Sequence, residues 1–209
     1  MNTVAERLAA WAEGEEARFL ARLEDEEPCN GWIGEYWRIV GDAADRPHYR
    51  HVDGRTIDAN GDRWAWSAAF IGAGVWAATR GADWFAYCEW HSTYVRDAIR
   101  RAGAGGDQPY RAYPIDAVPV RRGDVVVQWR TGIGDGAPDR PVTWETAPRI
   151  DPFTSHGDIV VRAADGVAEI VGGNLADTVQ RRRLILASDG HLRDAAQVRG
   201  HWFALIRFA

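Results

Sequence analysis

The sequence predicts an α+β fold in which helices come first and a central antiparallel sheet follows. Up to about residue 102, apolar side chains recur mostly at helical spacings among charged residues. Beyond residue 106, short apolar runs alternate with turns rich in Gly, Asp and Pro, which is typical of strands. Helices followed by an antiparallel sheet make an α+β architecture.

Four helical segments are predicted. The first covers 4–23 and places apolar side chains such as Trp11 and Phe19 among glutamates and arginines, as an amphipathic helix does. Pro28 ends it, so 1–27 is expected to pack as an N-terminal helix on the rest of the chain. The other three segments end at or just before glycine and cover 32–40, 67–81 and 91–102.

About five strands are predicted in the second half of the chain. They cover 125–129, 158–162, 167–171, 183–186 and 202–208. Two long polar segments are expected to be loops. The first, 42–62, leads to Ser67, and the second, 131–153, contains four prolines. Long loops in small domains often line a functional site, so we expect 131–153 to lie near a cleft that forms such a site.

Length and composition fit one globular domain spanning 1–209, with its main part over 28–209. A net charge of -5 argues against a nucleic-acid surface. No apolar run approaches the roughly 20 residues that cross a bilayer, so membrane insertion is not expected. The first residues lack the basic start and apolar stretch of a secretory signal. We therefore expect synthesis in the cytoplasm, and any export to proceed without a signal peptide.

Two distant segments have the residue types of a hydrolase site. Ser67 begins the apolar helix, where free amide N–H groups and the helix dipole favour negative charge. His156 opens a strand-like run at 159–161, so its ring would emerge at a strand edge. If the two side chains meet, they form a nucleophile with its base.

Six short motifs carry a resemblance to a known family. They are Glu35-Tyr36-Trp37, Trp66-Ser67-Ala68-Ala69-Phe70-Ile71, His91-Ser92-x-Tyr94, Arg122-Gly123-Asp124-Val125-Val126, Ser155-His156-Gly157-Asp158-Ile159-Val160 and Gly172-Gly173-Asn174. Over roughly 32–207 the chain resembles a bacterial family of unknown function, DUF2272, allied to the NlpC and CHAP cell-wall amidases. The resemblance implies a papain-like fold, in which a cysteine at a helix start attacks an amide.

Carried over by motif, the resemblance implies that Ser67 takes the nucleophile position, His156 the base position and Asn174 the position that orients the histidine. A serine hydroxyl is not ionised as a thiol is, so it needs a base to remove its proton during attack. The backbone N–H of Ser67 and a donor from 60–63 are expected to hold the oxyanion. Asp158, two residues after His156, is the second candidate for the orienting group.

Other residues are expected to bind substrate. His91 and Tyr94 share a helix face at three-residue spacing, and the resemblance implies that they line the cleft. Trp64 and Trp66 flank the nucleophile, where exposed indoles would stack on a sugar or peptide. Each assignment has a structural alternative: a helix cap for Ser67, a backbone-bonded strand end for His156, a left-handed turn for Asn174, a packed helix face for His91 and Tyr94, and core packing for the tryptophans.

No metal and no cofactor are expected. His48-x-x-His51 and Cys88-x-x-His91 have spacings that zinc uses, but neither pair has a convincing second pair. The absence of lysine excludes a phosphate loop that ends in lysine.

The leading hypothesis is therefore an amide or acyl-bond hydrolase with a Ser67–His156–Asn174 site. The resemblance implies peptidoglycan peptides as the substrate. One alternative is an inactive peptide- or glycan-binding module of the same fold. Another is a secreted or injected effector toxin whose partner is an immunity protein.

Overall fold

The computed structural model describes residues 3–130, 141–192 and 201–209. In these residues four α-helices precede all six strands of the sheet, which confirms the predicted α+β class. They are α1 (Val4–Phe19), α2 (Cys29–Ala43), α3 (Ser67–Thr79) and α4 (His91–Ala104), with short 3-10 turns η1 (Pro47–His51) and η2 (Ala147–Arg149).

The described strands form one open antiparallel sheet of six, in the order β1-β6-β2-β3-β4-β5. They are β1 (Tyr110–Pro114), β2 (Val125–Trp129), β3 (Ser155–Ala164), β4 (Val167–Leu175), β5 (Thr178–Ile185) and β6 (Trp202–Phe208). The strand β1 was not predicted. It is a short edge strand that ends in proline, and its pairing with β6 is invisible to a local sequence pattern.

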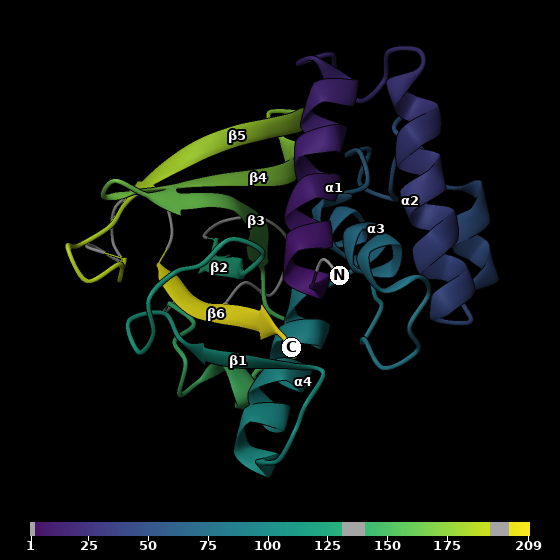
Figure 1. Ribbon diagram of the computed structural model, residues 1–209. Coiled ribbons are helices and arrows are strands. Elements are labelled where there is room, and N and C mark those ends of the chain that lie inside the picture. The colour runs from purple at the N-terminus through teal and green to yellow at the C-terminus, as the bar shows by residue number, and fades with distance from the viewer. Residues whose placement is uncertain (1–2, 131–140, 193–200) are drawn as a thin grey trace.

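Helices and loops cover the two faces of the sheet differently (Figure 1). Helices α1 and α3 pack on β3 and β4, while α4 packs mainly on β1. Val125, Val127 and Ile159 belong to the core on the helical side. Val126 and Val160 alternate with them and belong to a second, smaller core on the opposite face. Two buried faces explain why β2 and most of β3 read as continuous apolar runs.

The first helix ends earlier than predicted, at Phe19 instead of residue 23. Leu20 adopts a left-handed conformation with a φ of 51°, and its N–H bonds the carbonyl of Glu16. This is an αL stop of the kind that glycine usually provides. Because leucine occupies the position, the sequence pattern gave no signal for the stop.

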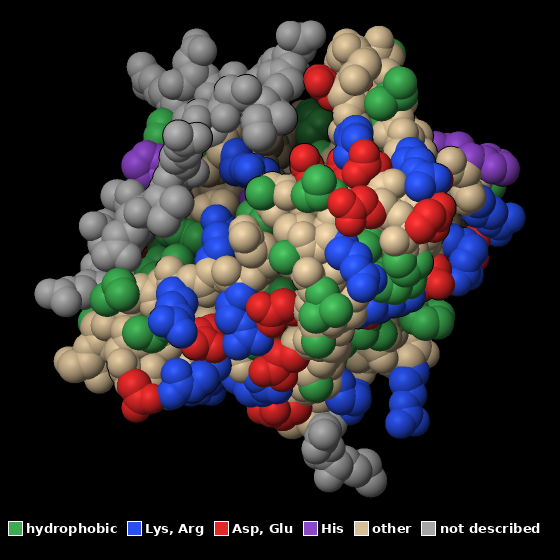
Figure 2. All heavy atoms as spheres, turned by 90° about the horizontal axis from the view of Figure 1, so that it is seen from above, with side chains coloured by type: hydrophobic (Ala, Val, Ile, Leu, Met, Phe, Trp, Pro, Cys, Tyr) green, Lys and Arg blue, Asp and Glu red, His purple; other side chains and the backbone are tan. Residues whose placement is uncertain are grey.

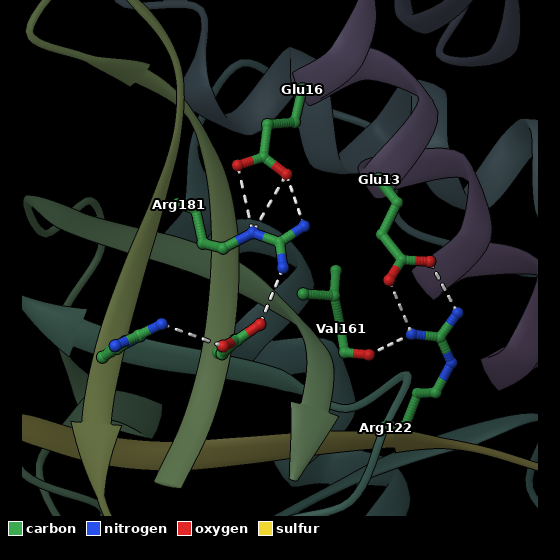
Figure 3. Close-up of polar contacts among 7 residues, drawn as sticks. Glu13, Glu16, Arg122, Val161 and Arg181 are labelled. Atoms are coloured by element: carbon green, nitrogen blue, oxygen red, sulfur yellow. Dashed lines mark hydrogen bonds and ion pairs between the residues drawn. The ribbon is translucent and has the colours of Figure 1, made fainter.

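Helix α1 is fastened to the sheet by arginine–glutamate pairs (Figure 3). Arg122 donates to both carboxylate oxygens of Glu13, at 3.1 and 2.8 Å, and also to the carbonyl of Val161. Arg181 of β5 contacts Glu16, with its Nε at 3.0 Å from each carboxylate oxygen. The turn before β2 and the strand β5 are thereby connected to one face of α1.

The Arg122-Gly123-Asp124 motif has a structural role in this arrangement. Gly123 has a φ of +85°, and a Cβ there would lie 2.4 Å from the backbone oxygen of Ala5 in α1. Glycine is therefore required for the close approach of α1. Asp124 is buried and accepts two hydrogen bonds from Arg207, at 2.9 and 2.8 Å. The motif joins α1, β2 and β6.

The long loop predicted over 131–153 falls partly outside the described residues, which exclude 131–140. In the remainder, Val142, Ala147 and Phe153 are buried in the main core. The turn η2 within it packs against α4.

Acidic and basic side chains are intermixed on the face shown in Figure 2. Among the helices described, none combines the length and the apolar character that crossing a membrane demands.

Candidate functional site

The centre of the candidate site is a hydrogen bond between Ser67 and His91. Ser67 is the first residue of α3 and His91 the first residue of α4. The Ser67 Oγ lies 2.7 Å from the His91 Nε2. Ser67 is 7% exposed and His91 5% exposed, so the bond lies at the edge of the protein interior. This geometry is that of a nucleophile with a base in reach.

Tyr94 holds the other side of the His91 ring. Its hydroxyl makes a short hydrogen bond with the His91 Nδ1, three residues earlier on α4. A spacing of three places both side chains on one side of the helix. A Cβ on Gly157 of β3 would lie 2.5 Å from the Tyr94 hydroxyl and 3.2 Å from the His91 Nδ1. Strand β3 therefore packs directly against Tyr94 and His91, and only glycine fits at position 157.

Burial sets the protonation states of the pair. It lowers the pKa of His91 well below its ordinary value, and the neighbouring His156 lowers it further. Burial also raises the pKa of Tyr94 well above its ordinary value. At neutral pH His91 is thus uncharged and Tyr94 keeps its proton. When His91 donates its Nδ1–H to the Tyr94 oxygen, its Nε2 is free to accept the Ser67 proton.

The start of α3 also offers anion-binding groups. Its first backbone bond runs from the Phe70 N–H to the Trp66 carbonyl at 2.9 Å, so the N–H groups at 67–69 precede the helical bonding pattern. With the helix dipole they favour negative charge beside Ser67. The 60–63 loop is the expected source of a second oxyanion donor. There, the backbone N–H groups of Asn60, Gly61 and Asp62 all donate hydrogen bonds to oxygen atoms of Asp58.

His156 lies next to this pair without bonding to Ser67. Its ring centroid is 5.5 Å from that of His91, and its side chain is fully buried. Neither ring nitrogen has a hydrogen-bond partner among the described residues. The His156 Nε2 lies 3.4 Å from the Asp158 Oδ1, which is a close polar contact but too long for a well-formed hydrogen bond.

Asp158 is held on its other oxygen by a short contact with Arg182 of β5. Burial of the Asp158 carboxyl opposes its ionisation, but His156 and Arg182 outweigh burial and hold its pKa below the usual value. A Cβ on Gly172 would lie 2.1 Å from the Asp158 Oδ1 and 2.9 Å from the His156 Nε2. The glycine of β4 thus makes room for this polar group.

Strand alternation explains why Ser67 pairs with His91 instead of the predicted His156. Gly157 faces His91 and Tyr94 on the helical side. His156 and Asp158 flank Gly157 in the strand, so they point to the opposite side, toward Gly172. His91 thus forms the hydrogen bond to Ser67, and the ring centroid of the predicted base, His156, lies 5.5 Å from that of His91.

The predicted orienting residue, Asn174, lies at an irregular point of β4. Its φ is 57°, in the left-handed region, and the β4–β5 register shifts between Gly172 and Leu175. Among the described residues, the polar group in contact with His156 is Asp158, the second candidate of the sequence analysis.

The two tryptophans before Ser67 belong to the core. Trp66 is 1% exposed, and its indole N–H donates to the buried Glu24 at 2.6 Å. Its ring packs near Phe19 with 5.9 Å between centroids, which leaves no free face for a ligand. Trp64 is partly buried and packs edge-on against Trp37. Both rings pack in or against the core beside the start of α3.

Sequence reasoning did not find the roles of His91, Tyr94 and Arg182. His91 and Tyr94 were expected to line a cleft, but their spacing alone does not show that His91 meets Ser67. Arg182 lies within Arg181-Arg182-Arg183, and its contact with Asp158 depends on the register of β4 and β5. Within the described ranges, no three His, Cys, Asp or Glu side chains are grouped as metal ligands would be.

Comparison with known proteins shows the family. The family model described as "Uncharacterized protein conserved in bacteria (DUF2272)" matches residues 25–208. No match was found among curated proteins or among solved structures. The match includes Ser67, His91 and the His156–Asp158 pair, and it leaves α1 outside. Since it covers most of the chain, the protein belongs to the bacterial family DUF2272.

Proposed function

We propose that this protein is a hydrolase that cleaves an amide or related acyl bond with Ser67 as the nucleophile. The observation that carries the proposal is the 2.7 Å hydrogen bond between the Ser67 Oγ and the His91 Nε2 at the start of two helices. A buried, neutral histidine in contact with a serine is the minimum needed to activate its hydroxyl. Tyr94 takes the position of the orienting third group.

The reaction would proceed in two steps. The Ser67 Oγ attacks the carbonyl carbon as His91 takes the hydroxyl proton, and the N–H groups at the start of α3 stabilise the oxyanion. His91 then returns the proton to the leaving amine, which releases it and leaves an acyl ester on Ser67. Water, deprotonated by His91, hydrolyses the ester and restores the serine.

The substrate class comes from the motif likeness to the NlpC and CHAP amidases. That likeness, together with an α+β fold that begins with helices, supports a papain-like arrangement acting on peptidoglycan peptides. In such an arrangement His156 and Asp158 would be the base and its partner. Their proximity to His91 makes the choice of base a question for mutagenesis.

The test compares single variants on peptidoglycan peptide fragments, with released amine as the readout. Ser67→Ala and His91→Gln are expected to lower kcat by a thousandfold or more, as removing a nucleophile or its base does. Ser92→Ala is the matched control, because Ser92 is a fully buried serine of α4 outside the proposed pair. Full activity in Ser67→Ala would overturn the proposal. A loss in His156→Gln but not in His91→Gln would move the role of base to His156.

A second candidate function is favoured by the burial of the Ser67 side chain. A hydroxyl that is 7% exposed gives a carbonyl carbon little room to approach. An inactive peptide-binding module of the same fold would tolerate this burial. It predicts equal peptide affinity for the unmodified protein and for Ser67→Ala, with no turnover by either.

A further inference from the structure

Arg182 lies next to the buried carboxylate of Asp158 in the sheet. Its guanidinium contacts the Asp158 carboxylate and lies 5.6 Å from the ring centroid of Trp202. The side chain of Arg182 is 24% exposed, whereas that of Asp158 is fully buried. The Arg182 guanidinium is therefore held by a buried carboxylate, while part of the arginine side chain remains accessible to solvent.

Arg130 lies on the same side of the sheet. It directly follows β2, and its N–H donates to the carbonyl of Thr154 at 3.2 Å. In the β2–β3 register Gln128 is opposite His156. Because side chains alternate along a strand, Arg130 projects to the same face as Gln128. Its side chain is partly buried, and no carboxylate of the described residues forms an ion pair with it.

Among the described residues, the carboxylate of Asp158 pairs with Arg182 and none pairs with Arg130. Burial lowers the pKa of Arg130, and the nearby charge of Arg182 lowers it further. The Arg130 charge also contributes to the lowered pKa of His91. Partly buried positive charge without a counter-ion is unfavourable, and a bound anion would relieve it.

Unpartnered polar atoms surround the same point. Within the described part of the chain, the Nε of Arg182, the Oε1 of Gln128 and both ring nitrogens of His156 are buried without a hydrogen-bond partner. Gln128 is 2% exposed and His156 fully buried. Native interiors rarely leave such groups unsatisfied, so their concentration beside two arginines indicates a site that a polar ligand completes.

We propose that Arg130 and Arg182 bind a carboxylate of the substrate on the face of the sheet that carries His156, whose ring centroid lies 5.5 Å from that of His91, so that the protein selects peptides carrying a free carboxylate. The proposal rests on the proposed hydrolase function, because only that function makes the bound peptide a substrate. A carboxylate is planar and accepts two parallel hydrogen bonds from a guanidinium fork, which suits an arginine pair better than a lysine pair.

The test measures binding without turnover, in a Ser67→Ala background. The probes are acetyl-Ala-Ala with a free C-terminal carboxylate and the same dipeptide with a C-terminal amide, titrated by calorimetry. The free acid is expected to bind at least tenfold more tightly, and Arg130→Gln is expected to abolish that difference. Arg50→Gln is the control, since Arg50 is an exposed arginine already paired with Asp42 at 2.7 Å.

Equal binding of acid and amide, absence of binding by both, or a preference that survives Arg130→Gln would each overturn the proposal. Thermal unfolding gives a second readout. Arg130→Gln removes an unpaired cation, so its melting temperature is expected to equal or exceed that of the parent. A clear decrease would show a structural partner for Arg130 and would also overturn the proposal. Because hydrolysis is not measured here, failure of the proposed function is detected separately.

Discussion

At the scale of single residues, the protonation state of His91 decides what the site can do. Its ring is fixed between the Ser67 hydroxyl and the Tyr94 hydroxyl, and burial keeps it neutral. Two helix N-termini meet at this ring, and their dipoles also oppose a positive charge on it. The arrangement favours an acceptor of protons over a permanent cation.

This predicts the pH dependence of the proposed reaction. A base acts only when unprotonated, and the pKa of His91 is lowered from its ordinary value of 6.5. A lower pKa means that the ring stays unprotonated further into the acid range. The value of kcat/KM is therefore expected to remain constant as the pH falls through 6.5, and to decline only below it. A pH profile from 4 to 8 measures this, and an acid limb centred at or above 6.5 would contradict it.

The position of Ser67, the proposed nucleophile, illustrates what could be predicted at this scale. A serine before an apolar helix is visible in sequence, and the structure places Ser67 at the start of α3. Its partner could not be predicted, because His91 and His156 are both near and only side-chain direction separates them. That direction depends on which face of β3 packs against α4, a property of the assembled sheet. The position of Asp158 beside His156 follows from strand alternation alone.

At the scale of elements, glycines determine how closely helices and strands approach at the site. Gly157 of β3 adjoins Tyr94, Gly172 of β4 adjoins Asp158, and Gly173 adjoins Trp66 and Phe70. Each lies where a methyl group would overlap a neighbour. The helix boundaries were predicted to within a few residues, because propensity and glycine stops are local. The strand pairs and the edge strand β1 were harder, because pairing joins distant residues.

A Gly157→Ala substitution tests the close contact between β3 and α4. The added Cβ would lie 2.5 Å from the Tyr94 hydroxyl, so either the tyrosine or the strand must shift. We expect the free energy of unfolding to fall by about 1–3 kcal/mol, the usual cost of overpacking. Chemical denaturation measures it, and loss of the Ser67–His91 contact would lower activity as well.

Gly103→Ala serves as the control, because a Cβ there meets nothing within 4 Å and the residue lies inside α4. Alanine favours a helix over glycine by roughly 0.5–1 kcal/mol, so this variant should be slightly more stable. Equal stabilities of the two variants would contradict the proposed contact.

At the scale of the whole molecule, ion pairs attach α1 to the sheet, and each pair joins two residues that are far apart in the sequence. Arg122 reaches Glu13 and Glu6 of α1, and Arg181 reaches Glu16. These groups are partly exposed, so each pair contributes modestly. Their effect is to attach the helix that covers α3. None of these pairs could be read from local sequence, since the partners are more than a hundred residues apart.

An Arg122→Gln variant is expected to be less stable by about 1–2 kcal/mol, from its lost pairs with glutamate and its lost bond to Val161. The comparison variant is Arg162→Gln, whose pair with Asp165 is largely exposed, and its change should stay within about 0.5 kcal/mol. In 1 M salt the difference between the two variants should shrink, because exposed charges are screened over about 3 Å. A difference that is independent of salt would argue against an electrostatic attachment.

The position of α1 has a practical consequence for work on this family. The family model begins at residue 25, whereas Trp11 of α1 packs on Phe70 with 4.8 Å between ring centroids and contacts the space left by Gly74. An excised fragment starting at that boundary would expose the flank of the helix that carries the serine to water. Expression trials should therefore retain the first turns of the chain, or the packing that supports the helix of Ser67 will be missing before any assay begins.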